Sequence, residues 1–240
     1  MFIKESTTLS ELEKKWEGPL RRYAELLASC SSARLTGSRD AGELYAFHVR
    51  DCLCSVPLLP TSGSVIDVGS GGGLPGLVWA ICRPDLSVAL LDSARKKCRA
   101  LEGFRDALGL TNVFVTWTRC EEHALTARET YALAAARALA HVGVLAEYLS
   151  PLTVHGGRLL AFKGPKGPAE LVQVGDQWDK LGLSRPYVLP YDPMARAGAE
   201  LERRDYSFII WEKNAPCPSL YPRKPGLALS KNWWHQEQAH

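Results

Sequence analysis

The sequence predicts an α/β fold, with a mostly parallel sheet that carries helices on both faces and follows a helical N-terminal segment. Seven short apolar runs, the first of them SVIDV from Ser64, alternate with longer stretches whose apolar residues recur at helical spacing. Such alternation is typical of parallel βαβ units. The 240 residues are enough for one large domain, and 46% hydrophobic with 23% charged residues is typical of globular proteins.

Residues 1–60 are predicted to form a helical cap in front of the sheet. Thr8 and Glu11 have the spacing of a capping box, and apolar residues follow them at helical intervals. The Gly18-Pro19 pair predicts a break, after which Pro19 occupies the first turn of a second helix. A third helix is expected over 41–54, because a proline follows shortly after it.

Residues 61–214 are predicted to form the main domain, and 215–240 a basic tail rich in proline and aromatic residues. A helix is expected over Ala169–Leu181, and the last two strands are expected to pair antiparallel at the sheet edge. The seven expected strands are Ser64–Val68, Ser87–Asp92, Asn112–Trp117, Tyr131–Ala138, Gly156–Gly164, Tyr187–Leu189 and Tyr206–Lys213.

Four glycines crowd into five positions of the stretch VIDVGSGGGLPGL, between the first strand and the next helix. Glycine permits a tight turn there and lets a ligand approach backbone N–H groups, although the glycines could instead only let the helix pack on the strand. The dinucleotide pattern G-x-G-x-x-G fails from Gly69, because Leu74 stands last, and matches poorly from Gly71. The alternating frame Asp67, Gly69, Gly71, Gly73 resembles motif one of the S-adenosylmethionine-dependent methyltransferases, whose ligand has no pyrophosphate.

Acidic residues follow the next two strands. Asp92 ends the second strand, where a carboxylate can accept hydrogen bonds from both hydroxyls of a ribose, cap the following helix, or do both. Ribose binding fits NAD and S-adenosylmethionine equally. After the third strand, the backbone of Cys120 and Glu121, or the Glu121 carboxylate, is positioned to meet an adenine amine; a solvated helix start is the alternative.

The chain resembles the small-subunit ribosomal RNA guanine-N7 methyltransferases (RsmG, also called glucose-inhibited division protein B). The resemblance rests on DVGSGGGLPG, LLDSARKKCRALE, TRCEE, AARALA and GGRLLAFKG, with ERRDYSFIIWEK and YPRKPG further on, and extends from about Pro19 to Gly226. It implies a Rossmann-like class I S-adenosylmethionine-dependent methyltransferase fold with a mostly parallel seven-stranded sheet. It also implies methyl transfer to N7 of a specific guanine in small-subunit (16S) ribosomal RNA.

The resemblance implies a set of site residues. For the cofactor they are Gly69, Ser70, Gly71, Gly73 and Leu74 in the glycine loop, Asp92, Ser93 and Ala94 at the ribose, Cys120 and Glu121 at the adenine, and Arg137 near the methionine carboxylate or the reacting centre. Arg119 and Arg204, which lie near expected strand ends, complete the expected catalytic set with Arg137.

The expected chemistry needs no strong general base. Guanine N7 has a free lone pair, so no proton must leave before it attacks the sulfonium methyl, and catalysis depends on proximity and alignment. Arg137 fits the role of a positioning residue, because a guanidinium binds a carboxylate or phosphate in bidentate fashion. The alternative is that Arg137 only pairs with an acid such as Asp67.

Ribosomal RNA is the expected partner, either free or in an assembling or assembled subunit. The net charge of +3 permits this without requiring it. Basic side chains interleaved with aromatic ones suit phosphate binding and base stacking, although any one of them could be ordinary surface or an anchor of the tail. The candidates besides Arg119 and Arg204 are Lys163, Lys166, Arg203, Tyr221, Arg223, Lys224, Lys231, Trp233 and Trp234.

Other readings stay open. An NAD-dependent dehydrogenase would need a better dinucleotide pattern, and a non-catalytic RNA-binding protein would not need an intact glycine loop. Another RNA or small-molecule methyltransferase is also possible from sequence. Seven scattered cysteines without zinc-ligand spacing indicate reduced thiols and no metal site. With no apolar run long enough for a membrane helix, we expect a cytoplasmic protein. A monomer is adequate for the expected reaction.

Overall fold

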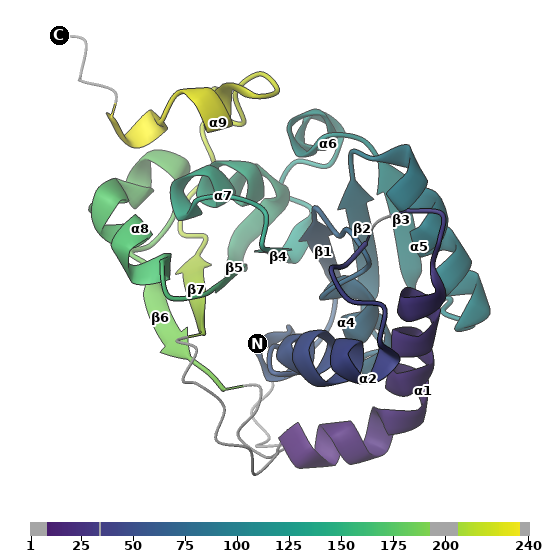
Figure 1. The fold of residues 1–240 in the computed structure, drawn as a ribbon. Helices are drawn as coiled ribbons and strands as arrows, with labels where there is room; N and C mark the ends of the chain where they lie inside the picture. The colour runs from purple at the N-terminus through teal and green to yellow at the C-terminus, as the bar shows by residue number, and fades with distance from the viewer. Residues whose placement is uncertain (1–8, 34, 193–205, 236–240) are drawn as a thin grey trace, which may run out of the picture. The chain divides into compact units, whose positions relative to one another are not determined.

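The computed structural model of the chain describes residues 9–33, 35–192 and 206–235 (Figure 1). These residues group into two units. The first comprises 9–118 apart from 34, together with 192, and the second comprises 119–191 and 206–235. None of the described helices is long and apolar enough to cross a membrane.

Three parallel strands form the sheet of the first unit: β1 (Ser64–Val68), β2 (Ser87–Asp92) and β3 (Val113–Trp117), in the order β3-β2-β1. The side chains of β1 after its first residue are all buried, as expected of a parallel strand that is covered on both faces. The parallel register aligns Asp67 of β1 with Leu90 of β2, and Asp92 with Trp117 of β3. The first three predicted strands are therefore confirmed.

Two helices connect these strands. Helix α4 (Gly76–Cys82) is buried along its whole length, and α5 (Arg95–Ala107) buries one face. The buried face of α5 contains Cys98, Leu101 and Phe104, spaced three residues apart, so one stripe of the helix lies against the sheet. Most exposed side chains of α5 are charged.

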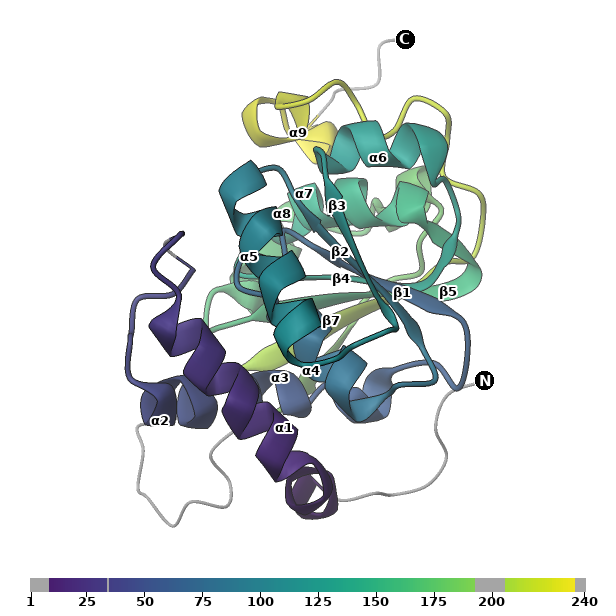
Figure 2. The same cartoon turned by 90° about the vertical axis from the view of Figure 1, so that its right-hand side faces the viewer.

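The N-terminal helix α1 (Leu9–Ser29) is continuous, so the predicted break at Gly18-Pro19 is wrong. A proline inside a helix removes a backbone hydrogen bond and costs about 3 kcal/mol. Leu20, Tyr23 and Leu27 become fully or almost fully buried beyond the proline, and their burial offsets this cost. The helix changes direction along its length, as expected of a proline kink (Figure 2).

A second helical run follows α1 and confirms the helix predicted over 41–54. It begins at Asp40, whose side chain accepts a hydrogen bond from the Glu43 N–H at 2.7 Å. It consists of α2 (Ala41–Leu44), a π-helical turn η1 (Tyr45–Val49), α3 (Arg50–Leu53) and a 3-10 turn η2 (Val56–Leu58). An Arg50–Glu13 ion pair of 3.1 Å joins this run to α1.

The sheet of the second unit has the order β4-β5-β7-β6. Strands β4 and β5 are parallel, whereas β7 pairs antiparallel with both β5 and β6, which confirms the antiparallel pair expected at the edge. The bounds are β4 (Tyr131–Arg137), β5 (Thr153–Lys163), β6 (Tyr187–Pro190) and β7 (Ser207–Glu212). The two units thus contain the seven strands of the predicted, mostly parallel α/β fold.

The helix predicted over Ala169–Leu181 is instead two segments, α8 (Gly167–Val174) and η4 (Trp178–Leu181). Gly175 ends α8 with a φ of 67°, a conformation that stops a right-handed helix. The remaining helices are α6 (Cys120–Thr126), α7 (Val142–Leu149), η3 (Ser150–Leu152), α9 (Leu227–Ser230) and η5 (Trp233–His235).

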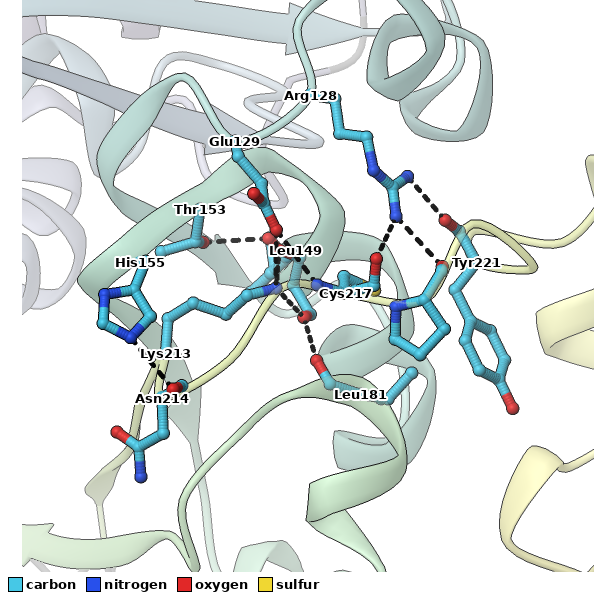
Figure 3. Close-up of polar contacts among 12 residues, drawn as sticks. Arg128, Glu129, Leu149, Thr153, His155, Leu181, Lys213, Asn214, Cys217 and Tyr221 are labelled. Atoms are coloured by element: carbon cyan, nitrogen blue, oxygen red, sulfur yellow. Dashed lines mark hydrogen bonds and ion pairs between the residues drawn. The ribbon is translucent and has the colours of Figure 1, made fainter.

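A polar cluster around the buried Lys213 holds the chain that leaves β7 (Figure 3). The Arg128 guanidinium donates to the carbonyl oxygens of Tyr221 at 2.8 Å, Pro218 at 2.9 Å and Cys217. The Glu129 carboxylate accepts the Cys217 N–H at 3.0 Å and lies 3.5 Å from the ammonium of Lys213. Lys213 is fully buried and also donates to Ser150, and burial lowers its pKa.

The turn at Gly182 generates a prediction about stability. An added Cβ at Gly182, where φ is 70°, would lie 2.3 Å from the Ala215 carbonyl oxygen, whereas Gly109 at a φ of 65° has open space around it. Gly182→Ala should therefore lower the free energy of unfolding by about 2–4 kcal/mol, and Gly109→Ala by only about 1 kcal/mol. Urea unfolding measures both. Equal losses would contradict the steric role of Gly182.

Candidate cofactor site

The glycine loop between β1 and α4 owes its composition to two separate constraints. Gly69, Gly71 and Gly73 have φ values of 74°, 57° and 94°, in the left-handed region that side chains disfavour. Gly72 has an ordinary conformation, but a Cβ there would lie 2.8 Å from Leu27 of α1. Three glycines are therefore required by the turn itself, and the fourth by packing against the N-terminal helix.

Most N–H groups of the loop already have acceptors within the chain. Gly69 and Ser70 donate to the Leu91 carbonyl at 2.8 and 3.0 Å, and Gly73 and Leu74 donate to the Ser70 carbonyl at 2.7 and 3.3 Å. The Ser70 hydroxyl, in turn, donates to the Asp67 carbonyl. The loop is thus tied to the end of β2, and it presents bare Cα atoms rather than a row of free N–H donors.

Asp67 is a structural carboxylate at the start of α4. It is fully buried, and its Oδ2 accepts the Gly76 N–H at 2.9 Å. A negative charge at a helix N-terminus complements the helix dipole. A phosphate brought to the same helix start would meet this carboxylate and be repelled.

Asp92 joins two of the predicted cofactor segments. Its Oδ2 accepts the Gly71 N–H at 3.0 Å, and its Oδ1 accepts the Ala94 N–H at 2.9 Å, at the start of α5. The Lys97 ammonium lies 3.7 Å from Oδ2. A carboxylate offers about four lone-pair directions, so Asp92 keeps capacity for a ribose hydroxyl while it fixes the loop. The residues predicted at 69–74 and 92–94 therefore form one cluster in the first unit.

Tyr23 is a supporting residue that our sequence analysis missed. It lies fully buried on α1, donates its hydroxyl to the Gly72 carbonyl at 2.7 Å, and packs edge-on against Phe104 of α5. A buried tyrosine hydroxyl needs a hydrogen-bond partner. This need was the only feature of the sequence that could have indicated the supporting role of Tyr23. The N-terminal helix therefore supports the glycine loop directly.

The residues predicted at the adenine lie at the start of α6 in the second unit. Cys120 is buried, and its thiol donates to the Tyr148 carbonyl oxygen at 3.3 Å. Burial raises the pKa of this thiol well above the ordinary value. The Glu121 carboxylate accepts the Gly226 N–H at 3.1 Å. Of the two contacts considered for adenine, the Glu121 carboxylate is therefore already occupied within the chain.

The predicted arginines differ in their settings. Arg137 ends β4 as expected and is half-buried. Arg119 is exposed just before α6, and its backbone N–H donates to Glu122 at 3.4 Å. Arg204, with Arg203, lies outside the described residues.

Most of the tail residues considered for RNA binding serve the fold. Trp233, Trp234 and Tyr221 are buried, and the Trp233 indole donates to the Gly143 carbonyl at 2.8 Å. Arg223 makes a bidentate pair with the fully buried Glu147, at 2.9 and 2.7 Å. These side chains anchor the tail and are not placed to stack on RNA bases. Lys163 is paired with Glu170 at 2.7 Å, whereas Lys166, Lys224 and Lys231 are exposed.

Comparison with solved structures agrees with the fold. A predicted O-methyltransferase from Agrobacterium tumefaciens superposes with a TM-score of 0.56 at 13% identity, covering 70% of this chain and 82% of its own. At this identity the likeness shows the fold alone, and it agrees with the class I methyltransferase architecture that was predicted.

Sequence comparisons identify the family. The ribosomal RNA small subunit methyltransferase G of Moorella thermoacetica is 38% identical over 217 residues, which cover 88% of each chain. The protein of the same name from Rubrobacter xylanophilus is 39% identical, over 88% of this chain and 82% of its own. The family model GidB, described as rRNA small subunit methyltransferase G, matches residues 17–189. The chain therefore belongs to the rRNA small subunit methyltransferase G family.

Proposed function

We propose that this chain transfers a methyl group from S-adenosylmethionine to N7 of a specific guanine in small-subunit (16S) ribosomal RNA. The observation that carries the proposal is the Asp92 carboxylate, which is bonded to both Gly71 and Ala94 at the end of β2. Family membership supports RNA as the substrate class. The assignment of N7 rests on the motif resemblance.

The first unit fits a nucleoside that carries no phosphate. Asp92 suits ribose hydroxyls, because a carboxylate is an acceptor only. Most of the loop N–H groups that a pyrophosphate would need are bonded within the chain, and the buried Asp67 carboxylate lies at the start of α4. These features favour S-adenosylmethionine over NAD. The glycine loop would face the methionine end of S-adenosylmethionine. Ser93 and Ala94 would lie beside the ribose, and the backbone of Cys120 and Glu121 would lie at the adenine.

The residues of the chain would contribute alignment and charge placement. When bound, S-adenosylmethionine supplies an electrophilic methyl group on a sulfonium. The chain needs only to hold guanine N7 in line with it, because no proton must leave. Arg137 would fix the methionine carboxylate or a phosphate, and Arg119 and Arg204 complete the proposed catalytic set. Cys120 is not a nucleophile in this scheme, because burial raises the pKa of its thiol.

We assign residues 1–60 to a helical cap that supports the glycine loop, 61–214 to the methyltransferase domain and 215–240 to an anchoring tail. Contact of α1 with the loop through Tyr23 supports the first assignment. We further propose a cytoplasmic monomer that acts on ribosomal RNA in an assembling or assembled small subunit.

The role of Asp92 predicts a loss of cofactor affinity on removal of its charge. Hydrogen bonds to a charged acceptor contribute about 1.5–3 kcal/mol, so Asp92→Asn should raise the Kd for S-adenosylmethionine by at least about tenfold. Isothermal titration calorimetry with S-adenosylmethionine and with NAD measures this. Asp106→Asn, which changes an exposed acid paired with its neighbour Arg105, is the matched control. An unchanged Kd, or tighter binding of NAD than of S-adenosylmethionine by the unmodified chain, would refute the assignment.

The Tyr23 hydroxyl predicts a link between the N-terminal helix and the cofactor. Tyr23→Phe leaves the buried Gly72 carbonyl without its donor, so the free energy of unfolding should fall by about 1–3 kcal/mol and the Kd for S-adenosylmethionine should rise several-fold. Tyr45→Phe is the control, because the Tyr45 hydroxyl bonds Glu13 at 3.2 Å and not the loop. Equal cofactor affinity in the two variants would argue against a positioning role for Tyr23.

Methyl transfer to RNA is the direct test of the proposal. The purified chain with S-adenosylmethionine should methylate small-subunit ribosomal RNA, free or in subunits, at one guanine. Borohydride reduction and aniline treatment should then cleave the RNA there, because N7 methylation labilises the base. Arg137→Lys keeps the charge but loses the bidentate fork, so it should lower kcat, whereas Arg185→Lys on the surface should not. Methylation at another atom, or of small molecules only, would overturn the proposal.

A further inference from the structure

An exposed tryptophan stands beside the residues proposed to bind the cofactor. Trp117 ends β3, the edge strand of the first unit, and 55% of its surface is exposed. In the parallel register it is the direct partner of Asp92, so the two side chains lie on the same face of neighbouring strands, about 4.8 Å apart in backbone spacing. Burial in the core therefore does not explain this large aromatic side chain.

The indole of Trp117 is held in a fixed orientation. Its Nε1 donates to the Ser93 carbonyl at 3.0 Å, and the Arg95 guanidinium carbon lies 5.0 Å from its ring centroid. In the described part of the chain, no aromatic ring stacks on it. The side chain is thus pre-organised with a cation over one face, which leaves its exposed surface open to a flat partner.

The first two turns of α5 carry a basic cluster that does not serve the helix. Arg95, Lys96 and Arg99 are exposed, and no ion pair joins them to an acid of the described residues, whereas Lys97 lies near Asp92. Positive charges at a helix N-terminus oppose the helix dipole, so this placement lowers helix stability. Arg95 and Arg99 are one turn apart and therefore share a face of α5.

We propose that Trp117, Arg95, Lys96 and Arg99 form a binding surface for single-stranded RNA that flanks the target guanine. A base stacks on the open face of the indole, and the phosphates of the same strand lie along the basic turns of α5. Aromatic rings combined with basic side chains bind single strands in this way, whereas a protein partner would not require the uncompensated cations. The inference rests on the proposed function, because it takes RNA as the substrate.

A matched pair of variants on one strand tests the surface. Phe114 lies on β3 three residues before Trp117, is 57% exposed, and has no cation from the described residues over its ring. Loss of one stacked base corresponds to roughly 5- to 100-fold in affinity. Trp117→Ala should raise the KM for deproteinised small-subunit RNA by this factor, with kcat unchanged. Trp117→Phe should retain most of the affinity, and Phe114→Ala should behave as the unmodified chain.

The basic cluster is tested by salt dependence. Filter binding of a labelled single-stranded oligoribonucleotide from the target region needs no methyl transfer. In this measurement Arg95→Gln with Arg99→Gln should flatten the slope of log affinity against log salt concentration by about 1.4, because each phosphate contact with a single strand contributes about 0.7 to the slope.

The outcomes separate this inference from the proposed function. Equal RNA affinity of Trp117→Ala and Phe114→Ala would overturn the proposed RNA-binding surface. A Trp117→Ala variant whose affinity for S-adenosylmethionine changes while its affinity for RNA does not would also overturn it. A defect that appears with intact small subunits but not with free RNA would assign the surface to a ribosomal protein instead. Failure of the unmodified chain to methylate RNA would overturn the proposed function. The oligoribonucleotide binding measurement would still decide whether the proposed surface binds RNA.

Discussion

The first unit depends on one carboxylate and the two N–H groups that it accepts. Asp92 binds Gly71 in the loop after β1 and Ala94 at the start of α5, so it connects three successive segments of the βαβ unit. Hydrogen bonds to an ionised, largely buried acceptor are stronger than neutral ones. Because both oxygens are already oriented by the backbone, a ribose would meet a carboxylate that needs no rearrangement, which reduces the cost of binding.

The glycine loop is also fixed from outside the βαβ unit. Tyr23 donates to the Gly72 carbonyl, and Leu27 packs where a Cβ of residue 72 would otherwise be. Asp67 fixes the opposite end of the loop through the Gly76 N–H. A loop of left-handed glycines is costly to order. The N-terminal helix, buried acids and the end of β2 together hold it in one conformation.

Charged groups of the second unit are used mainly to attach the C-terminal segment. Glu147 pairs with Arg223, Glu121 accepts from Gly226, and Glu129 faces both Lys213 and Cys217. Such buried groups are costly when one partner is missing, so they specify a single path for the tail. An RNA surface built from the tail aromatics is therefore disfavoured, and the exposed cations and indole near Asp92 are better suited to that role.

Local pattern alone predicted the strands, the glycine loop and the position of Asp92 at a strand end. These are short-range properties of the chain, because they depend on residues close together in sequence. The continuity of α1 through Pro19 was decided by burial of Leu20, Tyr23 and Leu27, which local helix rules do not include. The partners of Glu121 and Glu147 are 105 and 76 residues away in sequence. Only the folded chain brings such groups together. Tertiary structure therefore determined that the Glu121 carboxylate is occupied, that Arg223 is buried and that Tyr23 supports Gly72.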